Sequence, residues 1–253
     1  MKLLSQQIRQ YQSGKTAIFY LGQAGFILKT KSGAIVAIDL YLSNCCERLY
    51  GYKRLMPYLL EANELEFDML LITHAHEDHF DVDSIPNMMN NEKTILLAPE
   101  DVCERAYRLQ IPKEKMICIS AGESVSLEHC VVHAVFSDHG PEMPNAVGYI
   151  LEVDGKRIFV TGDTALRLDK ISDFLKYGPI DMMICPINGH FGNMSELDAV
   201  ELCEKIQPRV VIPCHYWNFA EHGGDPGVFT MQLKKRLPYQ NYIVMAMGEM
   251  VEF

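Results

Sequence analysis

Two series of short, strand-like apolar runs follow one another along the chain, and this pattern limits the fold more than any other feature. The first series opens with TAIFYL, GFILKT and AIVAIDL, separated by glycine-bearing turns. The second opens with CVVHAVFSD, AVGYILEV and RIFVTGD, with DGK at 154–156 as a hairpin turn. Later runs in each series alternate with helix-like segments. Two β-sheets packed face to face, with helices outside, would satisfy this pattern.

Helical segments are indicated in both series. SELDAVELCEKIQ, at 195–207, has its apolar residues at helical spacing, and Ser195 is the expected N-cap. A second helix is expected from near Pro99. The 253 residues suffice for one large α/β domain or two small ones, and no linker or low-complexity segment divides them.

Composition excludes several classes of protein. The chain is 48% hydrophobic and 22% charged, as in ordinary globular proteins. Its net charge is -10, and its densest basic cluster, KKR at 234–236, is best interpreted as a solvated helix face, so no nucleic-acid partner is expected. No run is long enough to span a membrane, and the N-terminus does not resemble a signal peptide. The eight cysteines form no C-x-x-C pair. We therefore expect buried free thiols in a cytoplasmic protein.

The stretch LLITHAHEDHFD, from Leu70 to Asp81, places several ionisable side chains directly behind an apolar run. His74 and His76 are two residues apart, so they would diverge on a helix but can share a face at a strand end. Asp78 and His79 are adjacent, and only a loop leaving the strand can turn both inward. Imidazole and carboxylate groups bind zinc, manganese or iron. The stretch therefore predicts a metal site in a loop.

Three further candidate ligands stand at the ends of other predicted strands. His139 follows AVFSD, Asp163 ends RIFVTGD, and His215 ends VVIPCH. Singly, an aspartate in TGDT is most simply a turn-former, and a histidine after a strand is most simply a surface group. Together with the loop after FDMLLIT, they place candidate ligands at four strand ends, a much sharper coincidence. His133, in mid-strand, is the alternative to His139.

The sequence resembles the metallo-β-lactamase superfamily, whose signature H-x-H-x-D-H is met by HAHEDH at residues 74–79. The resemblance covers Thr16 to Phe253 and implies a single domain over residues 1–253. The implied fold is the αββα sandwich, with two mixed β-sheets flanked by helices and a two-metal site at one edge of the sheets. The chain looks closest to the L-ascorbate-6-phosphate lactonase-like branch, through YLGQAGF, IDLYLS, ITHAHEDHFDV, IPKEKMICI, TGDT, PINGHFGNMS and VIPCHYWNF.

The resemblance also implies two sets of metal ligands joined by a bridging carboxylate. They are His74, His76 and His139 for one metal, Asp78, His79 and His215 for the other, and Asp163 between them. The implied cofactors are two divalent ions, zinc or manganese, with iron as a further alternative. The lactonase proper is longer and has an acidic residue where this chain has His139. A related branch of small hydrolases keeps a histidine there and has a similar PIxGHF loop.

The expected activity is opening of a lactone or ester of a small anionic metabolite, phosphorylated compounds included, by a hydroxide that bridges the metals. Asp78 and Asp163 are the expected catalytic residues, and Asp78 would bind metal and orient the hydroxide at once. The occupied site keeps a positive charge, which favours anionic substrates. Arg54, in the loop after Asp39, is expected to extend this charge, with Arg48 and Lys53 beside it in sequence.

Other polar residues complete the expected site. Asp39 and Asp81 would orient ring N–H groups of the ligand histidines. His190 and Asn193, in NGHFGNMS, are expected to contact the substrate. His129 and His222 lack a partner pattern, so they are interpreted as structural or solvent-facing, although the Gly-rich EHGGDP loop is a candidate border of the pocket.

Three other functions remain as alternatives. The first is a metal-dependent phosphodiesterase or nuclease of the same superfamily, although such nucleases usually add a substrate-binding arm and a basic surface. The second is a redox diiron protein, which would place an acid where this chain has His76. The third is a metal-binding or scaffold protein, for which a full ligand set would be superfluous. A homo-oligomer is left open.

Overall fold

The computed structural model describes residues 3–253, which divide into two compact units. The first unit comprises the chain up to Ile119 together with Met245–Phe253, and the second is Ser120–Val244. The expectation that residues 1–253 act as a single domain stays a prediction. None of the helices in the described part of the chain is long and apolar enough to cross a membrane.

The first unit is built on a seven-stranded mixed sheet with the order β14-β1-β2-β3-β4-β5-β6. Strands β14, β1, β2 and β3 pair antiparallel, whereas β3 to β6 run parallel. The strands are β1 Ala17–Gly22, β2 Gly25–Lys29, β3 Ile35–Ile38, β4 Met69–Leu71, β5 Ile95–Ala98, β6 Met116–Cys118 and β14 Met250–Glu252.

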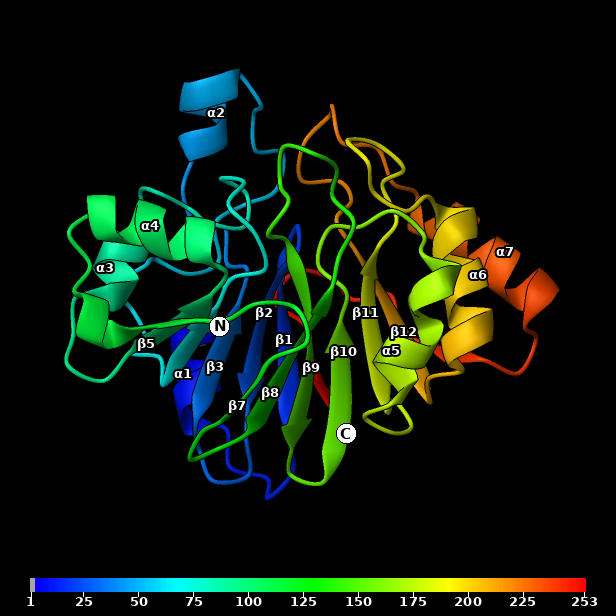
Figure 1. Cartoon of the computed structure of the whole chain (residues 1–253), viewed down its shortest axis with the longest axis horizontal. Coiled ribbons are helices and arrows are strands. Elements are labelled where there is room, and N and C mark those ends of the chain that lie inside the picture. Colours follow the sequence, from blue (N-terminus) through cyan, green and yellow to red (C-terminus); the bar gives the residue numbers. More distant parts are fainter. Residues whose placement is uncertain (1–2) are drawn as a thin grey trace. The chain divides into compact units, whose positions relative to one another are not determined.

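Short helices connect the strands of the first unit. They are α1 Leu4–Gln10, α2 Cys45–Tyr50, α3 Ile85–Met89, α4 Glu100–Arg108 and the 3₁₀ turn η1 Lys113–Lys115. The helix expected near Pro99 is α4, with Pro99 at its N-cap. Helix α4 contacts β6, and Figure 1 shows α3 and α4 beside the β5 end of the sheet.

The second unit repeats this plan with the order β13-β12-β11-β10-β9-β8-β7. Strands β7 to β10 pair antiparallel and β10 to β13 pair parallel. The strands are β7 Ser124–Ser126, β8 Val131–Phe136, β9 Val147–Val153, β10 Lys156–Val160, β11 Met182–Pro186, β12 Val210–Cys214 and β13 Asn241–Tyr242.

The helices of the second unit lie beside its parallel strands (Figure 1). They are the 3₁₀ turn η2 Leu168–Lys170, α5 Ile171–Leu175, α6 Glu196–Ile206 and α7 Pro226–Arg236. Helix α6 packs against β11 and α7. The predicted N-cap is confirmed: the Ser195 side chain accepts from the Asp198 amide, and the Asp198 carboxylate accepts from the Ser195 amide in a capping box.

The two sheets confirm the predicted fold class of two mixed sheets flanked by helices. In each sheet, the parallel strands have their carboxyl ends at one edge, where ligands usually bind in α/β proteins. Asp39 follows β3 and His74 follows β4 in the first unit, while Asp163 follows β10 and His215 follows β12 in the second. The fold therefore explains why polar residues stand where apolar strands end.

The cysteines are all free, and seven of the eight are buried; Cys118 is exposed. Burial raises the pKa of Cys130 to about 11 and that of Cys203 to about 12, so both stay protonated at neutral pH. These thiols contribute to the core, as expected, and are poor nucleophiles.

Candidate metal centre

The HAHEDH residues of the first unit lie in the loop that leaves β4, as predicted. The amides of His79 and Phe80 both donate to the carbonyl oxygen of His76, at 3.0 and 2.7 Å, which turns the loop back on itself. His74, Asp78 and His79 are buried, and His76 is half-buried. Burial of so many polar groups costs free energy unless each finds a partner.

Asp39 organises the rings of this loop. It is fully buried and has a left-handed backbone, with φ of 45°, directly after β3. Its Oδ1 accepts from the Thr73 amide at 2.8 Å, and its Oδ2 accepts from the Thr73 hydroxyl at 2.7 Å. The same Oδ2 lies 2.9 Å from Nδ1 of His79. Asp39 thus contacts the His79 ring nitrogen, and its orienting role toward a metal ligand stays a prediction.

The hydrogen-bond network assigns the protons on two ligand rings. Because the Thr73 hydroxyl donates to Asp39, its oxygen accepts from Nδ1–H of His74, 3.0 Å away. Nδ1–H of His79 donates to Asp39. In both rings Nδ1 therefore carries the proton and Nε2 carries a lone pair, which is the state in which histidine binds metal.

The atoms around these lone pairs fit a divalent cation. His74 Nε2 lies 3.0 Å from His76 Nδ1, and His79 Nε2 lies 3.6 Å from Asp78 Oδ2. Imidazole nitrogens with a carboxylate oxygen are a donor set that zinc, manganese and iron accept. A cation would bind the lone pairs of these neighbouring imidazole nitrogens. Without a cation, a proton must lie between two such nitrogens for them to approach so closely.

Gln23 is a contributor that the sequence reasoning did not single out. It lies in the turn between β1 and β2, is almost fully buried, and has a left-handed φ of 54°. Its Nε2 donates to Asp78 Oδ2 at 2.8 Å and so fixes that carboxylate. The only sequence signal was its place in the quoted match YLGQAGF, between two glycines.

Arg105 on α4 is a second contributor that the sequence reasoning missed. Its guanidinium donates to the carbonyl oxygen of Ala75, pairs with the buried Glu77, and lies over the Phe80 ring at 5.4 Å. Tyr50 donates to the other oxygen of Glu77 at 2.6 Å; burial and this bond raise the pKa of Tyr50. Ala75 and Glu77 alternate with the candidate ligand residues, so the contacts of Arg105 with them clamp the loop itself in place.

Asp81 and Arg54 have other roles than the sequence predicted. The carboxylate of Asp81 accepts hydrogen bonds from surrounding loop residues and not from an imidazole. The donors are the amides of Leu42, Ser43, Asp83 and Ser84 and the hydroxyl of Ser43. The Arg54 side chain is 9% exposed and donates to the carbonyl oxygens of Tyr41 and Ser43. It also lies 4.1 Å from the Tyr41 ring centroid. Both side chains hold the loop after β3 in place, which a sequence pattern cannot distinguish from substrate binding.

The second unit gathers its three predicted ligands around one oxygen atom. Asp163 Oδ2 lies 3.1 Å from Nε2 of His215 and 3.9 Å from Nε2 of His139. The three side chains are at most 6% exposed. Because imidazole nitrogens face a shared carboxylate in a buried place, this cluster also fits a divalent cation. His133 instead stacks on Tyr177 at 4.2 Å and bonds Ser124, so it belongs to the strand surface.

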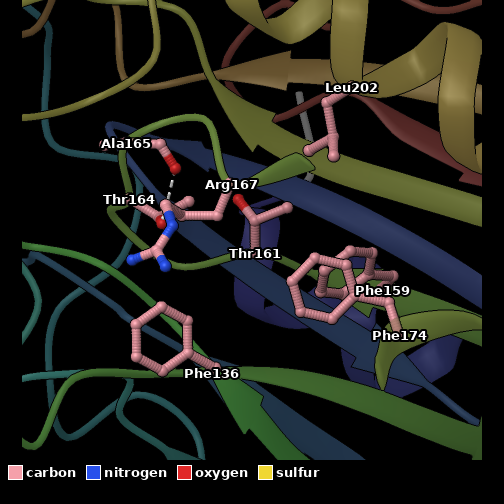
Figure 2. Close-up of a pocket in the computed structure, with 8 residues that line it drawn as sticks. All are labelled: Phe136, Phe159, Thr161, Thr164, Ala165, Arg167, Phe174 and Leu202. Atoms are coloured by element: carbon pink, nitrogen blue, oxygen red, sulfur yellow. Dashed lines mark hydrogen bonds between the residues drawn. The ribbon is translucent and has the colours of Figure 1, made fainter. Parts of the chain in front are cut away.

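Hydrogen bonds between side chains and backbone tie the loops that carry His139 and Asp163. Ser137 Oγ donates to the Asp163 carbonyl at 2.7 Å, and the Asp138 amide donates to Thr164 Oγ1 at 2.9 Å. Thr164 in turn donates to the Ala165 carbonyl, the dashed line in Figure 2. These bonds fix the spacing of the two ligand-bearing segments.

A small pocket of the second unit lies beside this turn (Figure 2). Phenylalanine rings form much of its wall, and the Arg167 guanidinium lies 5.1 Å from the ring centroid of Phe136. Arg167 also pairs with Asp138 and Asp169, each at 2.8 Å. The pocket lies against the TGDT turn, and none of its lining residues is a predicted metal ligand. Its lining residues are Phe136, Phe159, Thr161, Thr164, Ala165, Arg167, Phe174 and Leu202.

Loops after β11 and β12 surround the cluster. Asn193, expected to contact substrate, is 8% exposed and donates to Asp163 Oδ2 at 2.7 Å. His190 is exposed and lies against Gly223. His222, expected to be structural or solvent-facing, is buried, and its ring stacks on that of His215 with centroids 5.0 Å apart. The side chains able to hold a metal thus include His222 besides the predicted ones.

Comparison with known proteins agrees with this chemistry. Residues 17–215 match the family described as the Beta-lactamase superfamily domain. The chain is 28% identical over 225 residues to a UPF0173 metal-dependent hydrolase of Thermococcus onnurineus, covering 84% of this chain and 97% of the relative. The closer resemblance to the ascorbate-phosphate lactonase-like branch stays a prediction.

Solved structures show the same fold. A metallo hydrolase of Ignicoccus hospitalis superposes with a TM-score of 0.75 at 23% identity, covering 94% of this chain and 98% of that one. An isothiocyanate hydrolase from Delia radicum gut bacteria gives a TM-score of 0.74 at 13% identity, covering 94% and 98%. The match over most of the chain, together with the HAHEDH loop, shows that this protein belongs to the metallo-β-lactamase superfamily and is related to its metal-dependent hydrolases.

Proposed function

We propose that this protein is a metal-dependent hydrolase that opens a lactone or ester of a small anionic metabolite. The observation that carries the proposal is the cluster in the second unit, where one oxygen of Asp163 faces Nε2 of His139 and His215. A buried carboxylate that meets two imidazoles in this way is suited to bridge metal ions. The relatives named as metal-dependent hydrolases support the reaction class.

The proposed ligands are those that the resemblance to the superfamily implies. His74, His76 and His139 would hold one ion, Asp78, His79 and His215 the other, and Asp163 both. The assigned ring protons support this proposal, because His74 and His79 each present Nε2 and keep Nδ1–H for a protein acceptor. When bound, a pair of divalent ions lowers the pKa of a coordinated water toward 7 and polarises the substrate oxygen.

The chain's own residues would supply orientation and proton transfer. Asp78, fixed by the Gln23 amide, can orient the attacking water and accept its proton at a carboxylate oxygen. Asp39 maintains the ring orientation of His79 directly and of His74 through Thr73. Asn193 keeps Asp163 in position with its Nδ2–H. These bonds preorganise the site, so little rearrangement is needed when substrate arrives.

The charge of the proposed centre favours anionic substrates. Two dications exceed the charge of Asp78 and Asp163, so the site stays positive although the whole chain carries -10. Since Arg54 is bound to backbone carbonyl oxygens, the metals themselves are the proposed source of this preference.

Metal analysis and turnover test the proposal together. Protein purified without chelator should hold about two equivalents of zinc or manganese, because the ligand set exceeds what one ion takes while leaving room for water. The loaded protein should hydrolyse small lactones or carboxylate-bearing esters, and chelator should abolish turnover. Binding limited to one equivalent after saturation with both metals would refute the dinuclear centre. Turnover of phosphodiesters alone would favour the phosphodiesterase alternative.

A matched pair of histidines provides the control. His129 and His139 flank opposite ends of β8. His139→Ala should lose metal and activity, whereas His129→Ala should retain both. Equal behaviour of the two variants would remove His139 from the proposed ligand set.

A further inference from the structure

The loop from Asn188 to Asn193 lies beside Asp163 and His139 and reaches His215 through the ring of His222. At one end, Asn193 donates to Asp163. In the middle, a Cβ placed on Gly192 would lie 4.0 Å from Nδ1 of His139. Next to it, the Phe191 ring contacts the His222 ring, with centroids 5.1 Å apart, and His222 stacks in parallel on the third ligand, His215. Phe191 is therefore the apolar side chain that this loop places beside the ligand cluster.

Phe191 combines exposure with an unusual backbone. Its side chain is 54% exposed, and its φ is 54°. A left-handed conformation is unfavourable for a bulky residue, so the surrounding structure must impose it. Strain of this kind, on an aromatic ring left in water, is a common mark of a functional position.

Close packing holds the loop in that conformation. A Cβ on Gly223 would lie 3.1 Å from the Asn188 carbonyl oxygen and 3.2 Å from the His190 ring. A Cβ on Gly224 would lie 2.9 Å from Cβ of Tyr216 and 3.2 Å from the His215 carbonyl oxygen. Only glycine allows the segment after His222 to approach both neighbouring loops. The Phe191 ring is thus presented by a packed framework.

We propose that Phe191 is a specificity-determining residue, whose ring contacts an aryl or branched alkyl group next to the bond that is hydrolysed. The inference rests on the proposed function, and it narrows the substrate class to esters or lactones that carry an apolar substituent beside their anionic or metal-binding end. Covering the exposed ring with such a group removes apolar surface from water on both sides, which favours binding.

Three simple esters test where the apolar group binds. They are methyl acetate, methyl phenylacetate and phenyl acetate, whose hydrolysis is followed by acid release from metal-loaded protein. We expect the wild type to prefer at least one aryl ester to methyl acetate. Phe191→Ala should lower kcat/KM for that ester roughly 10-fold, mainly through KM, and should change methyl acetate by less than about twofold. Phe191→Leu should retain part of the preference.

Leu197 provides a matched control. It is exposed to the same 54% but belongs to α6, so Leu197→Ala should leave the ester preference unchanged. Calorimetry of phenylacetate against acetate, with each protein metal-loaded, adds a readout that needs no turnover. The wild type should bind phenylacetate more tightly, and Phe191→Ala should lose that difference.

The outcomes separate this inference from the proposed function. Equal loss for all three esters, with a lower metal content, would show that Phe191 supports the ligand loop and would overturn the inference alone. A wild type without aryl preference in both hydrolysis and binding would overturn it as well. If the loaded wild type hydrolysed neither these esters nor the small lactones and carboxylate-bearing esters, the proposed function would fail, and the phenylacetate comparison would still decide the role of Phe191.

Discussion

The candidate ligands of the first unit and those of the second unit are arranged in opposite ways. In the first unit, four candidate ligands lie within six consecutive positions of one loop, and a carboxylate behind them, Asp39, sets their rings. In the second unit, His139, Asp163 and His215 come from the ends of β8, β10 and β12. There the central carboxylate, Asp163, is itself a candidate ligand.

This difference indicates which substitutions should disrupt the candidate ligands of each unit. A single loop can lose one of the hydrogen bonds that hold it and keep its candidate ligands, because the chain itself keeps these residues close together. Ligands from separate strands have no such connection, so they depend on the atom they share and on the bonds between their loops. We therefore expect substitutions to be most damaging at Asp163 and milder behind the HAHEDH loop.

The largest expected effect is that of Asp163→Ala. It removes the oxygen that faces both His139 and His215, so activity should fall by more than about 100-fold, beyond the roughly 10–100-fold typical of residues behind the ligands. Metal content should fall with it. Asp169→Ala is the control, since Asp169 is an exposed carboxylate of the same connecting segment. Equal activity in the two variants would contradict a central role for Asp163.

A smaller effect is expected for Asp39→Asn. The amide cannot accept all the bonds that Asp39 accepts from Thr73 and His79, so the two rings lose their fixed orientation. Metal affinity should fall roughly 10–100-fold. Thr73→Val should cost less, because it releases only His74 from this network. Competition with a chromogenic chelator would measure both, and a larger loss in Thr73→Val would invert the proposed order.

Arg105→Gln should act mainly on stability. It leaves the Glu77 carboxylate, whose side chain is 8% exposed, without its cationic partner, at a cost of roughly 1–3 kcal/mol. Urea unfolding would measure this loss. Arg48→Gln, which breaks the exposed pair with Asp83, is the matched control and should change the unfolding free energy far less. Similar losses in both variants would mean that Arg105 does not clamp the loop.

Arg54→Ala should destabilise the fold and affect charged and neutral substrates equally. Its guanidinium is engaged by the carbonyl oxygens of Tyr41 and Ser43, so it is poorly placed to read a substrate anion. Comparing kcat/KM for an anionic ester and its neutral analogue would check this. A selective loss for the anion would restore the role that the sequence suggested.

The smallest effect is expected for Arg167→Ala. Arg167 is half-buried, and its guanidinium lowers the pKa of the exposed Asp169 through paired hydrogen bonds. A lowered pKa stabilises the folded state above the ordinary aspartate pKa of about 3.9, and that contribution disappears as the pH falls through the folded-state pKa. The difference in stability between wild type and variant should therefore be small at pH 7 and vanish in acid. A metal content equal to wild type would show that the two ligand loops keep their places without the Arg167 ion pairs.

The sequence by itself determined much of this protein. Alternating and apolar runs predicted the strands, because the period of a pleated strand is written in consecutive residues. The six-residue HAHEDH stretch predicted a metal-binding loop for the same reason, since all its members are neighbours in the chain. The N-cap at Ser195 was likewise visible, because capping needs only the next few residues.

Only the tertiary structure decided the roles of residues far apart in sequence. Strand β14 pairs with β1 across nearly the whole chain, and Arg105 reaches back to Glu77 and Ala75. The aspartates show the contrast: Asp39 meets an imidazole, whereas Asp81 meets backbone amides. Asp39 follows an apolar run and Asp81 follows the HAHEDH stretch, yet the sequence predicted the same role for both. Their chemistry differs because a carboxylate's role depends on which donors the folded chain brings to its oxygens, and no local pattern records those distances.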